Sequence, residues 1–168
     1  MFTKPLPMGR PSGAEKRTFA QVLIKSESAI YFMPEAPSAP LDAINAAAEQ
    51  VRQQLKLKAF DAEGAAHLAN FIQAQRGQLG AGERSGVVMA LGCFLGQCLV
   101  QVYRGEWGTG RDGTTGVGLG GRLFFNPFHL VDAQLNEGES ASVAAFFASV
   151  PGRLKAVAAR PHRRHQTQ

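Results

Sequence analysis

The sequence predicts an α+β fold: a single domain in which a small antiparallel sheet packs on a buried central helix with flanking helices. The chain has 168 residues, of which 45% are apolar, and this is enough for one hydrophobic core. Two cysteines are too few for a disulfide scaffold, so the core has to hold the fold together. An uncharged apolar run at 86–103 predicts the central helix, and a glycine-rich stretch at 105–121 predicts a hairpin.

The two ends of the chain are predicted to lie outside the domain. Residues 1–17 contain three prolines and two glycines with few apolar side chains, which predicts a flexible basic arm. The domain is expected to span 18–160, and residues 161–168 are expected to form a basic tail. At 18–33, two short apolar runs flank a polar stretch, which predicts a hairpin or, because the alternation is imperfect, a short helix. Three prolines within 34–40 predict a rigid linker.

Two amphipathic helices are predicted to follow the linker. The first spans 41–57, where apolar residues recur every three or four positions: Leu41, Ile44, Ala48, Val51 and Leu55. The second spans 61–76, with Asp61 as a favourable N-cap and Gly77 just past the predicted end.

Residues 86–103 are predicted to form the buried central helix. Gly92 and Gly96 lie four residues apart, so they share one face and allow another element to approach the helix backbone closely. The same run has nearly the length of a membrane span. The core of a soluble fold is favoured over a membrane span by four features of the sequence: three glycines in the run, two glutamines in the run, its marginal length and the lack of a second such run.

The glycine-rich stretch predicts strands at 106–107 and 116–119, joined by a turn at 111–113, because Asp-Gly favours tight turns. A third strand is expected at 122–125. Asn126 and Pro127 then fit the N-cap and the first position of a helix that closes at Gly138.

A last helix is predicted to begin at Ser140 as its N-cap. Pro151 is expected to break or kink this helix, because proline lacks the N–H that a helix interior needs. A final amphipathic turn or two then carries Leu154 and Val157.

Sequence motifs for cofactors and metals are weak. Residues 108–113 match the spacing G-x-G-x-x-G, but more glycines follow instead of a helix, so a dinucleotide site is not expected. Cys93 and Cys98 are five residues apart and point about 140° away from each other on a helix, so they neither pair nor share a metal. His162 and His165 enclose two arginines, which disfavour a cation. We predict no cofactor and no metal site.

Candidate functional residues cluster in the second half of the chain. His129 and Asp132 lie three residues apart on one predicted helix, where a surface ion pair is the default because no nucleophile is placed beside them. Glu106 precedes the only tryptophan, Trp107, and an outward glutamate beside a core tryptophan is favoured over a desolvated acid. No catalytic residue is predicted. The predicted partner-binding residues are Glu106, Arg111, Asp112, His129 and Asp132.

The net charge of +5 resides at the two ends of the chain. Residues 1–17 hold four basic residues and one acidic residue, and 152–168 hold five basic residues and no acidic one. The stretch 18–151 therefore has nine basic and twelve acidic residues, and this charge balance argues against nucleic-acid binding by the fold. The stretch 106–139 contains five acidic and two basic residues, which predicts an acidic patch that attracts a basic partner.

One stretch of the chain resembles a known group of domains. Residues 91–96 read Leu-Gly-Cys-Phe-Leu-Gly, Gly-Glu-Trp follows at 105–107, Phe-Asn-Pro-Phe at 125–128, and a phenylalanine-bearing helix ends in Val150-Pro151. This succession resembles small uncharacterised bacterial domains with a buried LGxxLG helix, a G-x-W hairpin and a P-F-x-x-V helix. The resemblance covers about 86–151 and implies a fold but no catalytic residue. Some members look like immunity or partner proteins of secreted bacterial toxins.

The sequence therefore predicts a cytoplasmic, non-enzymatic protein-binding module, of the immunity type or an effector partner, whose protein partner is a basic toxin or effector. No secretory signal is recognised and no membrane association is expected. One alternative is a small hydrolase or transferase that uses the hairpin from Glu106 to Asp112 together with His129. A second alternative is weak nucleic-acid binding through the basic tails.

Overall fold

The computed structural model describes residues 40–159. The predictions for the arm at 1–17, the apolar segment at 18–33 and the tail at 161–168 lie outside this range. In chain order the described elements are α2 (Pro40–Gln54), α3 (Ala62–Gln75), α4 (Ala81–Tyr103), β1 (Glu106–Thr109), β2 (Thr115–Leu119), β3 (Leu123–Phe125), α5 (Pro127–Glu137), the 3₁₀ turn η1 (Gly138–Ala141) and α6 (Val143–Ala158). This arrangement confirms the predicted α+β fold with a central helix against a small antiparallel sheet.

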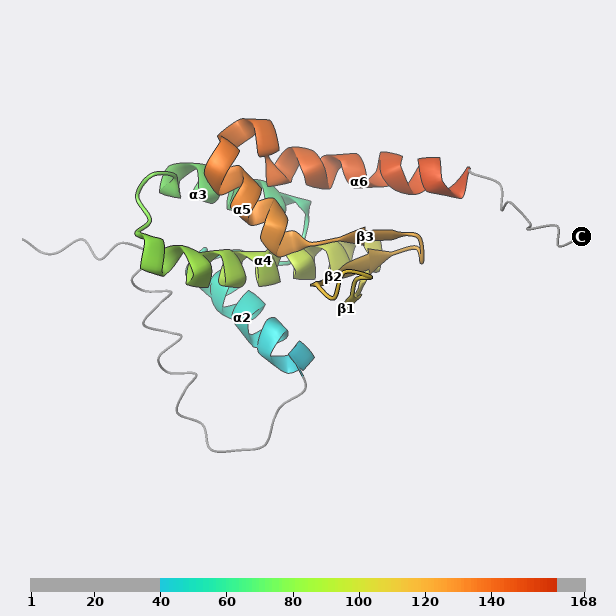
Figure 1. Cartoon of the computed structure of the whole chain (residues 1–168), viewed down its shortest axis with the longest axis horizontal. Helices are drawn as coiled ribbons and strands as arrows, with labels where there is room; N and C mark the ends of the chain where they lie inside the picture. Colours follow the sequence, from blue (N-terminus) through green and yellow to red (C-terminus); the bar gives the residue numbers. More distant parts are fainter. Residues whose placement is uncertain (1–39, 160–168) are drawn as a thin grey trace, which may run out of the picture.

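Helix α4 lies at the centre of the fold. In Figure 1, α2 lies on one side of it, α3, α5 and α6 lie on the other, and the sheet is at its C-terminal end. Nine of its residues are buried: Val87, Leu91, Gly92, Cys93, Phe94, Leu95, Gly96, Cys98 and Leu99. Among the described residues, α4 is the one helix long and apolar enough to cross a membrane by length and composition, and half of its most apolar window is buried inside the fold.

The predicted start of α4 at residue 86 is wrong by more than one turn. The helix begins at Ala81, and the Glu83 carboxylate accepts a hydrogen bond from the Gly80 backbone N–H at 3.1 Å. A carboxylate in the first turn satisfies a free N–H group and interacts favourably with the helix dipole. The uncharged run marks only the buried portion of this helix.

Helix α3 follows the sequence prediction closely, whereas α2 ends at Gln54, three residues before the predicted end, and Lys56 has a left-handed backbone at φ 55°. The Asp61 side chain accepts a hydrogen bond from the Gly64 N–H at 2.8 Å, which confirms the predicted N-cap of α3. In α2, Ala48 and Val51 are fully buried, whereas Leu41 at the other end of the same stripe is 47% exposed. Only the C-terminal half of α2 is therefore fully packed against the core.

The two helix glycines hold the sheet and α5 against α4. A methyl group at Gly96 would overlap the Trp107 ring, and one at Gly92 would overlap the Phe128 ring. The indole N–H of Trp107 also donates to Gln97 at 3.4 Å. This confirms the prediction that Gly92 and Gly96 allow a close approach to the helix backbone.

The sheet has the order β1-β2-β3, and both pairings are antiparallel. Trp107 lies opposite Val117, which lies opposite Phe125, and this row faces the core, where Val117 is fully buried. Because neighbouring residues on a strand point to opposite faces, the next row faces outward. That outer row consists of Glu106, Gly118 and Phe124.

Helix α5 begins as predicted, but the start predicted for the last helix is wrong. Asn126 caps α5 by accepting from the His129 N–H at 3.0 Å, with Pro127 in the first position. Ser140 lies within η1 and donates to the Glu137 carbonyl. Ser142 is the residue that caps α6, because its hydroxyl accepts from the Ala145 N–H at 3.4 Å.

Pro151 is expected to break or kink the last helix, and the break does not occur, since α6 continues through Pro151 to Ala158. Proline removes the N–H that would bind the carbonyl four residues earlier, which belongs to Phe147. In this fold the Tyr103 hydroxyl donates to that carbonyl at 2.9 Å. The Tyr103 and Phe147 rings also pack with their centroids 4.9 Å apart. A tertiary contact thus supplies the donor that the proline lacks.

Candidate functional site

The five predicted site residues separate into two regions of the fold. Glu106, Arg111 and Asp112 line a hollow over the outer face of the sheet. His129 and Asp132 lie on α5 and do not line this hollow.

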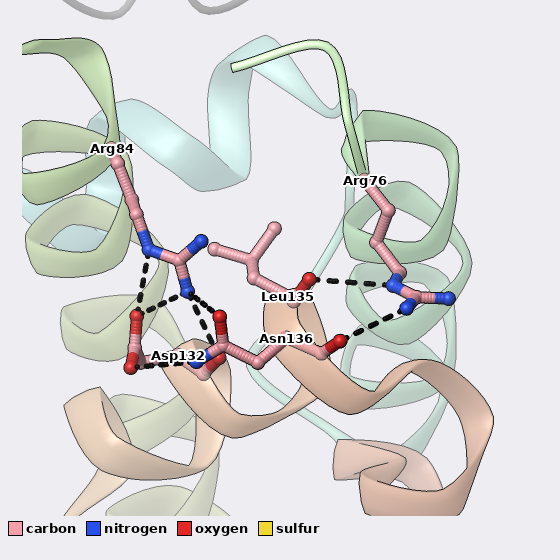
Figure 2. A network of polar contacts seen from close by, with 5 residues as sticks. All are labelled: Arg76, Arg84, Asp132, Leu135 and Asn136. Atoms are coloured by element: carbon pink, nitrogen blue, oxygen red, sulfur yellow. Dashed lines mark hydrogen bonds and ion pairs between the residues drawn. The ribbon is translucent and has the colours of Figure 1, made fainter. Parts of the chain in front are cut away.

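The α5 region is a structural network, shown in Figure 2. Arg84 of α4 donates through Nε and Nη2 to the Asp132 carboxylate at 3.0 and 2.6 Å. From the other side of α5, Arg76 donates to the carbonyls of Leu135 and Asn136 at 3.3 and 3.0 Å. These bonds tie the start of α4 and the end of α3 to the C-terminal half of α5.

The default ion pair of His129 with Asp132 is therefore not formed. Among the described residues, the ion pair of Asp132 is with Arg84, and Asn136 also donates to its second oxygen at 3.2 Å. His129 is exposed beside it. Asp132 therefore holds α5 to α4 through Arg84, and its side chain remains 39% exposed.

The hollow has a volume of about 980 Å³ and lies over the three strands and their connections. We call it the sheet hollow. It is lined by Arg104, Glu106, Trp107, Gly108, Thr109, Gly110, Arg111, Asp112, Gly118, Gly120, Gly121, Arg122, Leu123 and Phe124.

The floor of the sheet hollow combines glycines with one aromatic ring. Methyl groups at Gly110 and Gly116 would stand 2.8 and 2.7 Å from atoms of the Phe124 ring, so the ring lies across these two residues. Phe124 nevertheless remains 39% exposed. At Gly108 a side chain would meet open space, so the backbone of β1 is accessible from this face. The hollow therefore has a rigid apolar surface beside uncovered backbone.

Charged side chains from three connections surround this floor. Arg104 ends α4, Arg111 lies in the turn between β1 and β2, and Arg122 lies in the turn between β2 and β3. Arg122 donates to the Val157 carbonyl at 2.9 Å. Within residues 40–159, the side chains of Arg104 and Arg111 make neither a hydrogen bond nor an ion pair. Both are exposed.

The acids of the sheet hollow are Glu106 and Asp112. The Asp112 carboxylate accepts from the Thr114 hydroxyl at 2.8 Å and from its N–H at 3.1 Å. These two hydrogen bonds lower the pKa of Asp112 below its usual range. Asp112 is thus a charged part of its own turn, while Glu106 is exposed at the start of β1.

Two acids of the acidic patch predicted from residues 106–139 lie near arginines from other parts of the fold. Its Asp132 is paired with Arg84, and its Glu106 lies beside Arg104 in the lining of the hollow. Both arginines come from outside the counted window, so the local count omitted them. Three arginines and two acids line the sheet hollow.

Sequence reasoning missed Arg104, Arg122 and Phe124. The sequence did hold a signal for Phe124. Side chains alternate between the two faces of a strand, so a strand at 123–125 with Leu123 and Phe125 pointing inward places Phe124 on the outer face. Trp107, expected in the core, is half-buried and contributes both to the core-facing row and to the lining of the hollow. No local signal marks Arg104 or Arg122, since their positions depend on how the turns fold back over the sheet.

Groups suited to metal or thiol chemistry are not assembled in the described part of the chain. No group of three histidine, cysteine or acidic side chains there could hold a metal ion. Cys93 and Cys98 are free and buried, and burial raises the pKa of the Cys93 thiol to about 11.

The chain matches no family model, no curated protein and no solved structure. The resemblance to small bacterial domains thus remains a prediction from the sequence.

Proposed function

We propose that this chain is a non-enzymatic protein-binding module whose partner docks at the sheet hollow. The observation that carries the proposal is the exposed Phe124 ring, held on a glycine floor and surrounded by charged side chains. Rigid aromatic side chains contribute strongly to protein interfaces, and arginine is enriched there as well. Three of the five sequence candidates line the same hollow.

An immunity-type role is one form of this proposal. In that role, the module would bind a secreted bacterial toxin and block it. The basis is the sequence resemblance alone, so a toxin-like neighbouring reading frame would support it.

The enzyme alternative needs His129 beside the carboxylates of the hairpin. His129 does not line the sheet hollow, whereas Glu106 and Asp112 do. A general base must lie within hydrogen-bond reach of its substrate, directly or through one water. The geometry therefore favours binding over catalysis. The alternative of nucleic-acid binding through the basic tails concerns residues outside the described range.

The proposal is tested by capture of partners from native lysate with matched variants of the full chain. Phe124→Asp places a charge in the sheet hollow, and Met89→Asp places one on α4, where Met89 is 52% exposed and outside the hollow. We expect proteins captured by the wild type to be retained by Met89→Asp and lost with Phe124→Asp. Capture unchanged by Phe124→Asp, with both variants folded by circular dichroism, would contradict the proposal.

A further inference from the structure

We infer that the sheet hollow receives an extended acidic polypeptide segment, which pairs with the edge of β1 opposite β2 and places an apolar side chain on Phe124. This inference rests on the proposed function and specifies the chemistry of the partner. It reverses the charge of the partner that the local sequence count predicted.

The first argument is the edge of the sheet. Within residues 40–159, β1 pairs only with β2, so in this part of the chain the backbone N–H and C=O groups of its other edge have no strand partner. All four residues of β1 line the sheet hollow. An extended peptide can add to such an edge through main-chain hydrogen bonds.

At the other end of the strand order, β3 has side-chain contacts with the protein's own helix α6. The Phe125 ring of β3 packs on Phe146 of α6 with centroids 4.9 Å apart, and Arg153 lies over both rings. The edge of β1 lines the hollow, so it is the edge that we assign to a partner strand.

The second argument is charge. Arg104 and Arg111 lie in the lining of the hollow, and neither makes a hydrogen bond or an ion pair within residues 40–159. Asp112 is held by Thr114, which leaves Glu106 as the one acid of the lining without a bonded partner in that range. A planar guanidinium binds a carboxylate through two parallel hydrogen bonds. Carboxylates on a partner would form ion pairs with both arginines.

The third argument is the shape of the outer face. Gly108 and Gly118 leave the backbone of β1 and β2 uncovered, and a methyl group at Gly118 would find only contacts of 3.8 Å or longer. Phe124 lies next to these glycines and supplies the large apolar surface of the outer face. An extended segment with one apolar side chain fits such a surface better than a bulky folded element does.

The test uses Trp107, which is the only tryptophan of the full chain and lines the hollow. A short tryptophan-free peptide that alternates glutamate and valine around a central phenylalanine is titrated at low salt while the tryptophan emission is recorded. Its lysine-for-glutamate counterpart and oligothymidylate serve as comparison ligands. We expect the acidic peptide to shift the emission and to bind at least about tenfold more tightly than the lysine peptide, the ratio falling at high salt.

Matched charge reversals locate the site. Arg104→Glu with Arg111→Glu is expected to weaken binding of the acidic peptide more than about tenfold. Lys56→Glu with Lys58→Glu changes the net charge by the same amount outside the hollow and is expected to change binding less than about twofold. Bound peptide should also slow amide hydrogen exchange in Glu106–Thr109.

Several results would overturn the inference. The first is an acidic peptide that leaves the Trp107 emission unchanged, and the second is equal affinity for the acidic and the lysine peptide. The third is that Arg104→Glu with Arg111→Glu weakens the binding of oligothymidylate but not that of the acidic peptide. Another is a β1 edge that is protected in the wild type and becomes exposed when residues 1–33 are deleted, since the chain itself would then cover the edge. If Phe124→Asp still abolishes capture of a native partner, the proposed function stands and only the acidic-segment inference fails.

Discussion

The two arginines at opposite ends of α4 differ in what they bind. Arg84, in the first turn, donates to Asp132 and Asn136 and so ties α4 to α5. Arg104, which follows the last turn, has a left-handed backbone at φ 57° and is exposed in the lining of the sheet hollow. One arginine stabilises the fold, and the other is available to a ligand. The comparison shows that arginine content alone does not mark a binding site, whereas arginines without bonds around a hollow do.

The largest effect on stability is expected at the contact between the sheet and α4. This contact fixes the turns of the sheet, which carry Arg111 and Arg122. Gly96→Ala would overlap the Trp107 ring and should lower the free energy of unfolding by about 2–3 kcal/mol. Gly82→Ala, in the same helix, meets open space and should raise it by about 0.4–1 kcal/mol. Chemical denaturation followed by circular dichroism measures both. Equal midpoints would mean that the sheet is not held at Gly96, and the sheet end would lose its rigid support.

The second-largest effect on stability is expected for the hydrogen bond that Tyr103, at the C-terminal end of α4, donates to the Phe147 carbonyl. Tyr103→Phe leaves the Phe147 carbonyl without its hydroxyl donor and should cost about 1–2 kcal/mol. In the Pro151→Ala background, the restored N–H can bind the same carbonyl, so Tyr103→Phe should cost less. Denaturation of the four proteins gives the coupling energy. Strictly additive costs would show that Tyr103 does not compensate for the proline.

The comparison of the arginines themselves predicts a smaller difference. Arg84→Met removes bonds whose partners are about one-third exposed, so the loss of stability should be about 1 kcal/mol. Arg104→Met should change stability by less than about 0.5 kcal/mol. Thermal melts of the two variants provide the measurement. A similar cost for both would contradict the distinction between a structural arginine and a free one.

The smallest effect is the titration of Asp112. Because hydrogen bonds from Thr114 hold the folded-state pKa below the ordinary 3.8, the turn gains stability above that pH and loses it as the pH falls through the folded-state pKa. The pKa of the Asp112 carboxyl, measured by NMR, should lie below 3.8 in the wild type and rise in Thr114→Val. A pKa unaffected by Thr114→Val would show that Asp112 is not held in the turn, and it would then be free to neutralise Arg111.

Most helices and the hairpin could be predicted because their signals are local. The Asp61 and Asn126 caps, the apolar spacing of α3 and the Asp112-Gly113 turn act over a few residues, and all appear at the predicted places. At Ser140 the prediction failed locally, because Ser142 caps α6 while Ser140 donates to the Glu137 carbonyl. The continuation of α6 through Pro151 has no local signal, because it depends on Tyr103 from another part of the chain.

The sheet hollow was predicted only in part. Glu106, Arg111 and Asp112 were found because they share one hairpin, and their turn chemistry is readable from sequence. His129 and Asp132 were added from spacing on a helix, but the structure places them outside the hollow.

The sequence by itself determined where most of the described helices and the hairpin form, because capping, turn geometry and apolar periodicity act between near neighbours in the chain. The tertiary structure decided that α6 continues through Pro151 and which of the charges at the two ends of α4 find partners. Arg84 and Asp132 are 48 residues apart and meet at 2.6 Å, whereas Arg104 and Glu106 are nearly adjacent and form no ion pair within the described residues. Hydrogen bonds and Coulomb interactions depend on distance and direction in space, and separation along the chain determines neither.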